Sequence, residues 1–199
     1  MRMNNNEEVT TMGARRAIYI TGGARSGKSS FAESLASEIS ERVLYVATSE
    51  AFDQEMKDRV KKHQAQRPST WDTVEIFQNL QSLRDEEVFL KAKVLLLDCL
   101  GFLLNNLMYY SNLDFENLDF EALDKFEQSV LGEIEDLVKL VEKSDKSLII
   151  VSNEIGMGIV PNDPLSRAYR DILGRLNRRA QELSNEAYIL ISGIPLQLK

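Results

Sequence analysis

A glycine-rich stretch near the beginning of the chain carries residues that could bind phosphate. Residues 22–29 read GGARSGKS and fit the spacing G-x-x-x-x-G-K-[ST]. Glycines at these positions let successive backbone N–H groups approach an anion, Lys28 would neutralise phosphate charge, and the Ser29 hydroxyl would ligate Mg²⁺. The pattern therefore predicts a nucleoside triphosphate site formed by Gly22, Gly23, Ala24, Arg25, Ser26, Gly27, Lys28 and Ser29.

An acidic residue at the end of an apolar run is a second candidate for phosphate chemistry. Residues 94–98 read VLLLD, which is typical of a Walker B strand. Asp98 would hold Mg²⁺ directly or through water, or polarise an attacking hydroxyl group. The alternative is a carboxylate that only caps a turn, and the presence of the glycine-rich stretch favours the first interpretation.

His63 is the only histidine in the chain, and its role is open from the residues alone. It lies in a lysine-rich segment, 50–66, whose apolar spacing predicts a helix that ends before Pro68. A histidine on such a face is usually solvated, but an imidazole can also attack phosphorus and form a covalent intermediate. In that case Lys62 and Arg67 would neutralise phosphate charge.

Strands and helices alternate around these residues. Apolar runs predict strands at 17–21, 42–49, 71–77, 94–98, 147–152 and 187–192, the last closed by residues 193–195. Helical spacing predicts helices at 28–41, 50–66, 102–110, 121–143 and 165–183, with helix and loop at 79–93. This order predicts an α/β fold, a mostly parallel sheet with helices on both faces. Residues 17–199 are expected to form one domain, and residues 1–16 a flexible N-terminal extension.

Two further segments follow predicted strands, where ligands bind in open parallel sheets. Residues 47–49 read ATS, and residues 153–161 form a glycine-punctuated loop that is longer than a plain turn requires. This placement favours a functional role over a simple strand-to-helix connection. The arginines of the 165–183 segment could bind phosphate or a partner subunit, but most of them are better explained as a solvated helix face.

Composition limits the function classes. The 199 residues carry a net charge of −7, which disfavours general nucleic-acid binding because that needs a basic surface. The single cysteine, Cys99, excludes an intrachain disulfide, and the absence of a Cys/His cluster excludes a zinc site. No apolar run approaches a membrane span, and the start lacks the apolar core of a secretory signal. We therefore expect a cytoplasmic protein without stable membrane insertion.

Several motifs together resemble one family. GGARSGKS, YVATS, RVKKHQAQRP, WDTVE, LLLDCL and VSNEIGMGIVP are similar to segments of the bifunctional adenosylcobinamide kinase / adenosylcobinamide-phosphate guanylyltransferases of cobalamin biosynthesis. The resemblance covers residues 17–199 and implies a RecA-like P-loop fold that assembles as a homotrimer. It implies that ATP or GTP phosphorylates adenosylcobinamide, a small-molecule corrinoid. GTP then donates GMP to the product, giving adenosylcobinamide-GDP and pyrophosphate.

The resemblance also assigns residues. His63 matches the histidine that carries GMP covalently, so the implied catalytic residues are His63, Lys28 and Asp98. Beyond residues 22–29, the implied nucleotide contacts are Ala47, Thr48, Ser49, Gln64, Ala65, Gln66, Arg67, Glu75 and Asp98. Mg²⁺ would be held by Ser29 and Asp98. Neither the N-terminal extension nor the acidic connection at 111–121 matches these motifs.

Three other functions stay open at this point. The chain could be another P-loop small-molecule kinase in which His63 is incidental, or a nucleotide-binding switch without enzymatic activity. It could also be a relative that retains only guanylyl transfer. Replacement of His63 would distinguish the enzymes that need this residue from the kinase and the switch.

Overall fold

The computed structural model describes residues 15–49, 67–117 and 119–199. Its strands are β1 (Ala17–Gly22), β2 (Val43–Ala47), β3 (Asp72–Glu75), β4 (Val94–Asp98), β5 (Ser147–Val151), β6 (Glu186–Ile191) and β7 (Ile194–Gln197). Its helices are α1 (Lys28–Ile39), the 3₁₀ helix η1 (Leu80–Asp85), α3 (Glu87–Lys91), α4 (Leu100–Tyr110), α5 (Phe120–Lys143) and α6 (Pro164–Glu182). The helix predicted at 50–66 lies outside the described residues.

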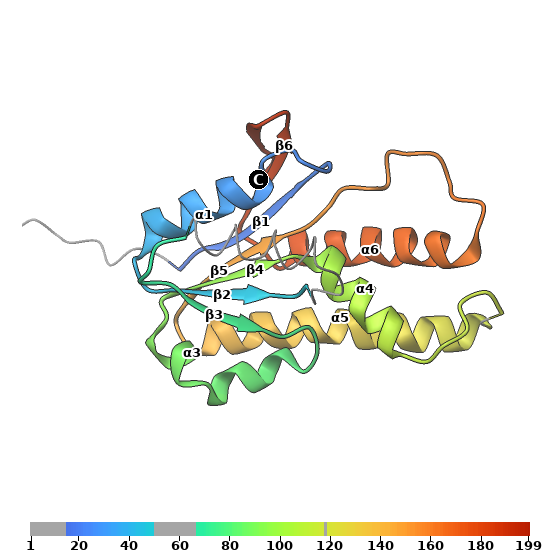
Figure 1. The fold of residues 1–199 in the computed structure, drawn as a ribbon, viewed down its shortest axis with the longest axis horizontal. Helices are drawn as coiled ribbons and strands as arrows, with labels where there is room; N and C mark the ends of the chain where they lie inside the picture. Colours follow the sequence, from blue (N-terminus) through green and yellow to red (C-terminus); the bar gives the residue numbers. More distant parts are fainter. Residues whose placement is uncertain (1–14, 50–66, 118) are drawn as a thin grey trace, which may run out of the picture.

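The described strands form one seven-stranded sheet in the order β3-β2-β4-β5-β1-β6-β7 (Figure 1). Neighbouring strands pair in parallel except β6 and β7, which are antiparallel. The register aligns Ala47 with both Glu75 and Asp98, so three predicted site residues lie in one row at the carboxyl edge. The expected α/β fold with a mostly parallel sheet is therefore confirmed.

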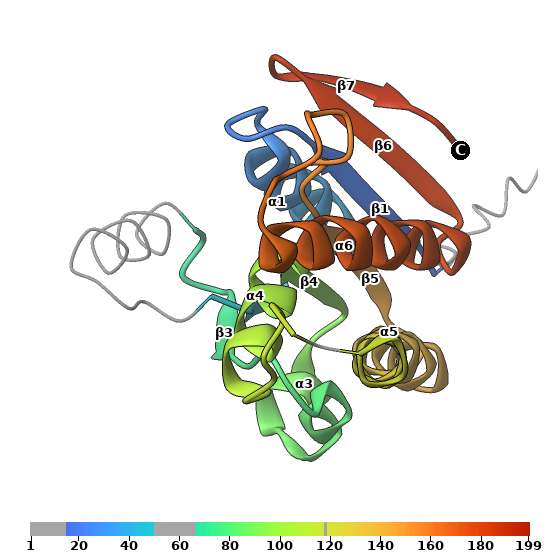
Figure 2. The same ribbon diagram turned by 90° about the vertical axis from the view of Figure 1, so that its right-hand side faces the viewer.

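Helices cover both faces of the sheet (Figure 2). In β4, Val94 and Leu96 belong to the core cluster that includes residues of α1, whereas Leu95 and Leu97 belong to the cluster that includes residues of α4, α5 and α6. Such two-sided burial explains the continuous apolar runs, because each face of a strand meets apolar side chains. The amphipathic stripe of α5 contributes Val130, Ile134, Leu137 and Val141 to the second cluster.

The expectation that residues 193–195 simply close the last strand is wrong. Ser192 and Gly193 both have positive φ, 52° and 86°, and turn the chain into the edge strand β7. Two consecutive residues with positive φ are typical of the tight turn of a β-hairpin. Pro195 is tolerated because edge strands leave one row of backbone groups unpaired. The strand gave little signal because its four residues are all exposed.

Three helices begin one or two residues before the expected position, and one of them is α5, which begins at Phe120 and not at residue 121. The helix expected at 102–110 begins at Leu100, directly after Cys99 in extended conformation. The helix expected at 165–183 begins at Pro164, where Asp163 accepts a hydrogen bond of 2.7 Å from the Ser166 N–H. An aspartate cap followed by proline is a favoured helix start, so this boundary was readable from the residues.

Contacts with the fold begin before β1. The Arg16 side chain makes two hydrogen bonds to the Glu186 carboxylate, at 2.7 and 2.6 Å, and its backbone N–H donates to the Ser147 hydroxyl. Arg15 donates to the Glu142 carbonyl at 2.7 Å. Residues 15 and 16 of the expected extension thus contact the fold. Among the described residues no helix is long and apolar enough to cross a membrane.

Candidate functional site

The glycine-rich stretch forms the loop between β1 and α1 at the carboxyl edge of the sheet. A Cβ atom at Gly22 would lie 2.5 Å from the Leu190 carbonyl oxygen and 2.8 Å from the Ser26 hydroxyl, so only glycine fits there. Gly27 caps α1 with φ at 92°, a left-handed conformation that favours glycine. The Gly193 N–H donates to the Ser26 carbonyl at 3.0 Å, so the β6–β7 turn supports the loop.

Lys28 lies at the first position of α1, with its side chain buried. Its ammonium group donates to the Gly23 carbonyl at 2.6 Å, and burial lowers the pKa of the amine. The nearby Ser26 hydroxyl is buried and has no hydrogen-bond partner among the described residues. Helix N-termini and glycine loops present several backbone N–H donors together. A bound phosphate group would therefore pair its negative charge with Lys28 and accept hydrogen bonds from these N–H groups on its oxygens.

Asp98 lies at the end of β4, and hydrogen bonds hold both its carboxylate and the residue that follows it. Tyr45 donates its hydroxyl hydrogen to Asp98 Oδ2 at 2.9 Å. The Thr48 hydroxyl donates to the Cys99 carbonyl at 2.7 Å and accepts from the Cys99 N–H at 2.8 Å. Asn106 in turn donates to the Thr48 carbonyl at 2.8 Å. Thr48 is 1% exposed. Its buried hydroxyl therefore positions Cys99, the residue that follows Asp98.

The oxygen ligands at this edge are those expected for a Mg²⁺ ion that also binds phosphate oxygens. Such an ion keeps several waters and takes one or two carboxylates together with phosphate oxygens. Asp98 supplies a half-buried carboxylate and Ser29 a partly exposed hydroxyl. The described residues contain no cluster of three or more His, Cys, Asp or Glu side chains that could hold a metal ion by themselves.

Four of the predicted contacts outside the loop line one pocket of about 410 Å³. Ala47, Thr48, Ser49 and Glu75 all line it, together with Ile76, Phe77, Gln78, Asn79 and Ser82. The pocket begins where β2 and β3 end, which is where parallel α/β sheets bind ligands. Residues 47–49, expected from their place after a strand, and Glu75, expected from the resemblance, are thus neighbours in space.

Arg67 also lies beside this edge, but its guanidinium is engaged within the chain. Its Nε atom is 3.1 Å from Glu33 Oε1 on α1, and its guanidinium carbon lies 3.3 Å from the centre of the Tyr45 ring. Sequence reasoning missed Tyr45 because its apolar strand neighbours make it look like a core residue. His63, Gln64, Ala65 and Gln66 lie outside the described residues.

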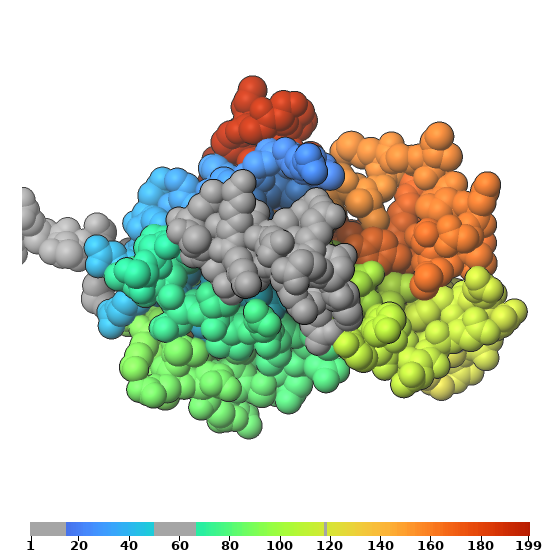
Figure 3. Space-filling view, in the orientation of Figure 1, coloured from blue at the N-terminus to red at the C-terminus, as the bar shows by residue number. Residues whose placement is uncertain are grey.

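The loop at 153–161 adjoins the glycine-rich loop, as its position after β5 predicts. The Glu154 N–H donates to the Gly22 carbonyl at 3.0 Å. Arg170 of α6 donates to the Gly156 carbonyl at 2.7 Å, so at least one of the arginines holds this loop. Figure 3 shows the loop (orange) projecting from the surface, and Ile159, one of its residues, is 96% exposed.

Burial makes Cys99 a poor nucleophile although it adjoins Asp98. Its side chain is buried, and desolvation raises the pKa of the thiol to about 12. The nearby Asp98 carboxylate raises the pKa further, since a thiolate would be repelled by it. The thiol therefore stays protonated at neutral pH.

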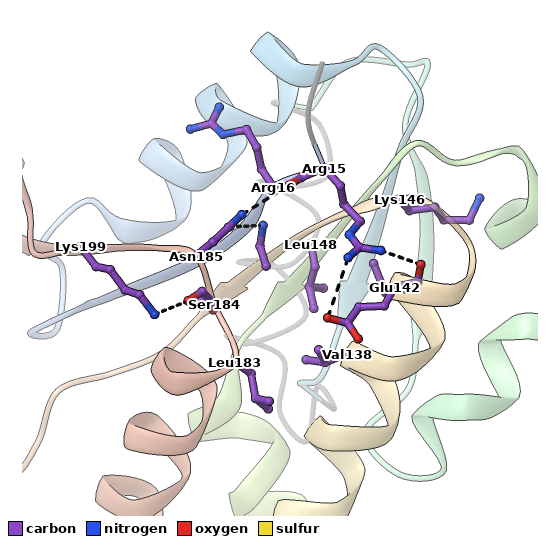
Figure 4. A pocket seen from close by; sticks show the side chains of 12 residues that line it. Arg15, Arg16, Val138, Glu142, Lys146, Leu148, Leu183, Ser184, Asn185 and Lys199 are labelled. Atoms are coloured by element: carbon purple, nitrogen blue, oxygen red, sulfur yellow. Dashed lines mark hydrogen bonds and ion pairs between the residues drawn. The ribbon is translucent and has the colours of Figure 1, made fainter. Parts of the chain in front are cut away.

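A second pocket, of about 270 Å³, lies at the opposite edge of the sheet (Figure 4). Val138, Leu148 and Leu183 contribute an apolar lining. Its charged groups are used within the chain: Arg15 binds Glu142, and Lys199 donates to the Ser184 carbonyl at 2.6 Å. The glycine loop, Lys28 and Asp98 lie at the other, carboxyl edge of the sheet.

A parallel α/β sheet with a glycine loop, a buried lysine and an acid-bearing strand defines a P-loop nucleotide-binding protein. Residues 18–198 match the CobU family, described as cobinamide kinase / cobinamide phosphate guanyltransferase. The chain belongs to this family.

Characterised relatives match over most of the chain. The bifunctional adenosylcobalamin biosynthesis protein CobU of Escherichia coli is 39% identical over 92% of this chain and 99% of its own length. CobU of Salmonella typhimurium is 36% identical over the same shares. CobP of Pseudomonas aeruginosa is 39% identical over 90% of this chain and 95% of its own. The crystal structure of a KaiC-like protein of Pyrococcus horikoshii aligns with 89% of this chain and 72% of its own chain, with 14% sequence identity and a TM-score of 0.46.

Proposed function

We propose that this protein catalyses both reactions of its family. In the first, ATP or GTP transfers its γ-phosphoryl group to the aminopropanol hydroxyl of adenosylcobinamide. In the second, GTP transfers GMP to adenosylcobinamide phosphate, releasing pyrophosphate and giving adenosylcobinamide-GDP. The observation that carries this proposal is the family match over residues 18–198, which includes the complete P-loop and Asp98.

The described residues supply the phosphate chemistry that both reactions need. The loop N–H groups and Lys28 would hold the triphosphate. They would also stabilise the negative charge on the phosphate oxygens of the leaving group. Ser29 and Asp98 would hold Mg²⁺, which neutralises phosphate charge when bound. Ala47, Thr48, Ser49 and Glu75 line the pocket at this edge and would position the rest of the nucleotide in both reactions. Arg67, four residues after His63, would contact the nucleotide in guanylyl transfer. Phosphoryl transfer depends mainly on such positioning.

His63 would carry the covalent step. One imidazole nitrogen attacks the α-phosphorus of GTP, a P–N bond forms, and the bond to the pyrophosphate oxygen breaks. A phosphate oxygen of adenosylcobinamide phosphate then attacks the same phosphorus, and the P–N bond breaks to release the imidazole. Gln64, Ala65 and Gln66 would contact the nucleotide next to it. The family resemblance supports these assignments.

The remaining parts of the proposal concern the whole protein. We infer a homotrimer on the basis of the family resemblance, and a cytoplasmic enzyme that uses soluble nucleotides and a corrinoid. Residues 17–199 would form the single catalytic domain, with the N-terminal extension outside it. Light scattering of the purified protein would measure the oligomeric state directly.

Labelling with radioactive GTP tests the covalent step. The protein is mixed with Mg²⁺ and GTP labelled on the α-phosphate, quenched in base, and examined for label retained on the protein. We expect label that is stable in base and lost in acid, because phosphoramidates have this stability. It should be absent with γ-labelled GTP and from His63→Ala, whereas Lys61→Ala, a change in the same segment, should keep it.

Two other results would contradict the proposal. Bound GTP without any retained label would indicate a plain kinase or a nucleotide switch. Retained label in His63→Ala would move the covalent step to another residue. Phosphorylation of adenosylcobinamide by His63→Ala, measured with γ-labelled ATP, would show that the kinase step is separable from guanylyl transfer.

A further inference from the structure

Three side chains from three segments form a compact cluster beside the nucleotide site. Arg67 is held between Glu33 of α1, at 3.1 Å, and the Tyr45 ring of β2, whose centre lies 3.3 Å from the guanidinium carbon. The Arg67 side chain is 8% exposed, so this cation is largely removed from water. A carboxylate on one side and an aromatic face on the other compensate for that loss. We call Glu33, Tyr45 and Arg67 the arginine clamp.

The arginine clamp is connected directly to Asp98, the carboxylate at the end of β4. The Tyr45 hydroxyl donates to Asp98 Oδ2 at 2.9 Å while the ring of the same residue contacts Arg67. Burial raises the pKa of the Tyr45 hydroxyl, and the Asp98 charge raises it further. Tyr45 therefore remains a neutral donor, and one side chain connects the acid of β4 to the arginine.

The sequence position of Arg67 gives the clamp its significance. Arg67 follows His63 by four residues. A chain advances at most about 3.6 Å per residue, so four residues separate the two Cα atoms by no more than about 14 Å. Glu33 belongs to the helix that begins at Lys28. The clamp thus fixes Arg67, four residues after His63 in the sequence, to the helix that carries the phosphate-binding lysine.

We propose that Glu33 and Tyr45 are positioning residues for guanylyl transfer, acting through Arg67 to fix where the chain after His63 meets the P-loop helix. This inference rests on the proposed function. Attack on the α-phosphorus needs the nucleophile within about 3–3.5 Å and in line, so a small displacement of its anchor slows this step strongly. Transfer of the γ-phosphoryl group does not use His63 and does not depend on the contact between Glu33 and Arg67.

The decisive variant is Glu33→Gln, which keeps the side-chain shape and removes the charge that holds Arg67. We expect the single-turnover rate of GMP attachment to the protein to fall about 10- to 100-fold. The rate of adenosylcobinamide phosphorylation should stay within about twofold, since positioning of His63 is not involved. Glu38→Gln is the matched control, because Glu38 is an exposed glutamate of the same helix.

Two variants at Tyr45 separate its ring from its hydroxyl. Tyr45→Phe keeps the face that contacts Arg67 and loses the hydrogen bond to Asp98, so both reactions should slow in proportion. Tyr45→Leu also loses the aromatic face, and GMP attachment should then fall about tenfold further relative to phosphorylation. The measured quantity is the ratio of the two rates, which a general loss of folded protein does not change.

The outcomes separate this inference from the function on which it rests. If the wild-type protein forms no GMP adduct, both the proposed function and the role of the clamp are wrong. If the wild-type protein forms the adduct and Glu33→Gln forms it equally fast, only the clamp proposal is overturned. An equal fall of both rates in Glu33→Gln would also overturn it, because that result indicates a structural role.

Discussion

At the scale of single residues, the nucleotide loop depends on the close approach of two backbones. Gly22 faces the Leu190 carbonyl oxygen, which a Cβ atom would approach to 2.5 Å. Gly23, its neighbour, has no such contact within 4 Å. These two glycines have the same sequence context and different surroundings, so they offer a direct comparison.

Gly22→Ala should therefore destabilise the protein, whereas Gly23→Ala should not. The new methyl group must displace the backbone of β6, and we expect a loss of about 1–3 kcal/mol in the free energy of unfolding. Urea unfolding of both variants and the wild-type protein measures the difference. Equal stability of the two variants would show that the loop adapts to the methyl group.

Residue types and spacing predicted most of the described site. The P-loop and Asp98 followed from motifs whose chemistry demands those residues, residues 47–49 from their place after a strand, and Glu75 from the resemblance. Tyr45 and Glu33 were missed because their proposed roles rest on contacts between segments that lie far apart in the sequence. An aromatic residue in a buried strand gives no signal that its hydroxyl meets a carboxylate. The roles of His63 and its three following residues stay predictions.

At the scale of elements, an ion pair connects the beginnings of β1 and β6. Arg16 and Glu186 make two hydrogen bonds, and their side chains are 31% and 22% exposed. The Arg16 guanidinium holds the pKa of Glu186 below its ordinary value of 4.5. A lowered carboxyl pKa means that the pair stabilises the fold fully above that value and loses its effect as the pH falls through the native pKa.

Glu186→Gln should consequently cost about 1 kcal/mol of unfolding free energy at pH 7, a value reduced for partial exposure. The difference from the wild-type protein should shrink as the pH falls below about 4.5, because protonation removes the same charge. Urea unfolding at several pH values checks this. Glu87→Gln, at an exposed pair with Lys91, is the control, and a difference that persists at low pH would argue against the ion pair as the cause.

Element boundaries could be predicted where burial and caps coincide. β4 has the predicted bounds, 94–98, because its apolar run stops at a charged residue. β7 was not predicted because it is only four residues long and its apolar residues, Ile194 and Leu196, are exposed at the sheet edge and not part of the core. The Ser192–Gly193 turn was the available signal, since serine-glycine pairs favour tight turns.

At the scale of the whole molecule, Cys99 reports on the integrity of the fold. It is the only cysteine in the chain, it is buried, and its thiol pKa is raised to about 12. A thiol reagent at neutral pH should react with it only when the protein opens, and therefore much more slowly than with the same protein in urea. With a chromogenic disulfide reagent, the absorbance of the coloured thiolate that the reaction releases measures the rate. Fast reaction of the native protein would mean that the end of β4 opens locally.

The alternation of strands and helices predicted the fold class, but not the strand order. β5 lies between β1 and β4, so the loop lysine and the acid come from strands that are not adjacent. Nothing in the hydrophobic pattern specifies which strands pair, because every buried strand is apolar on both faces. The row formed by Ala47, Glu75 and Asp98 therefore became visible only in the structure.

The support of the glycine loop by the β6–β7 turn has a consequence for protein synthesis. The glycine loop emerges from the ribosome early. Leu190, which packs against Gly22, and Gly193, which donates to the Ser26 carbonyl, emerge much later. β1 likewise lacks both of its neighbours, β5 and β6, until then. A nascent chain therefore carries its phosphate-binding residues without their binding conformation, and the growing polypeptide stays unable to sequester nucleotide until the central strands have closed around β1.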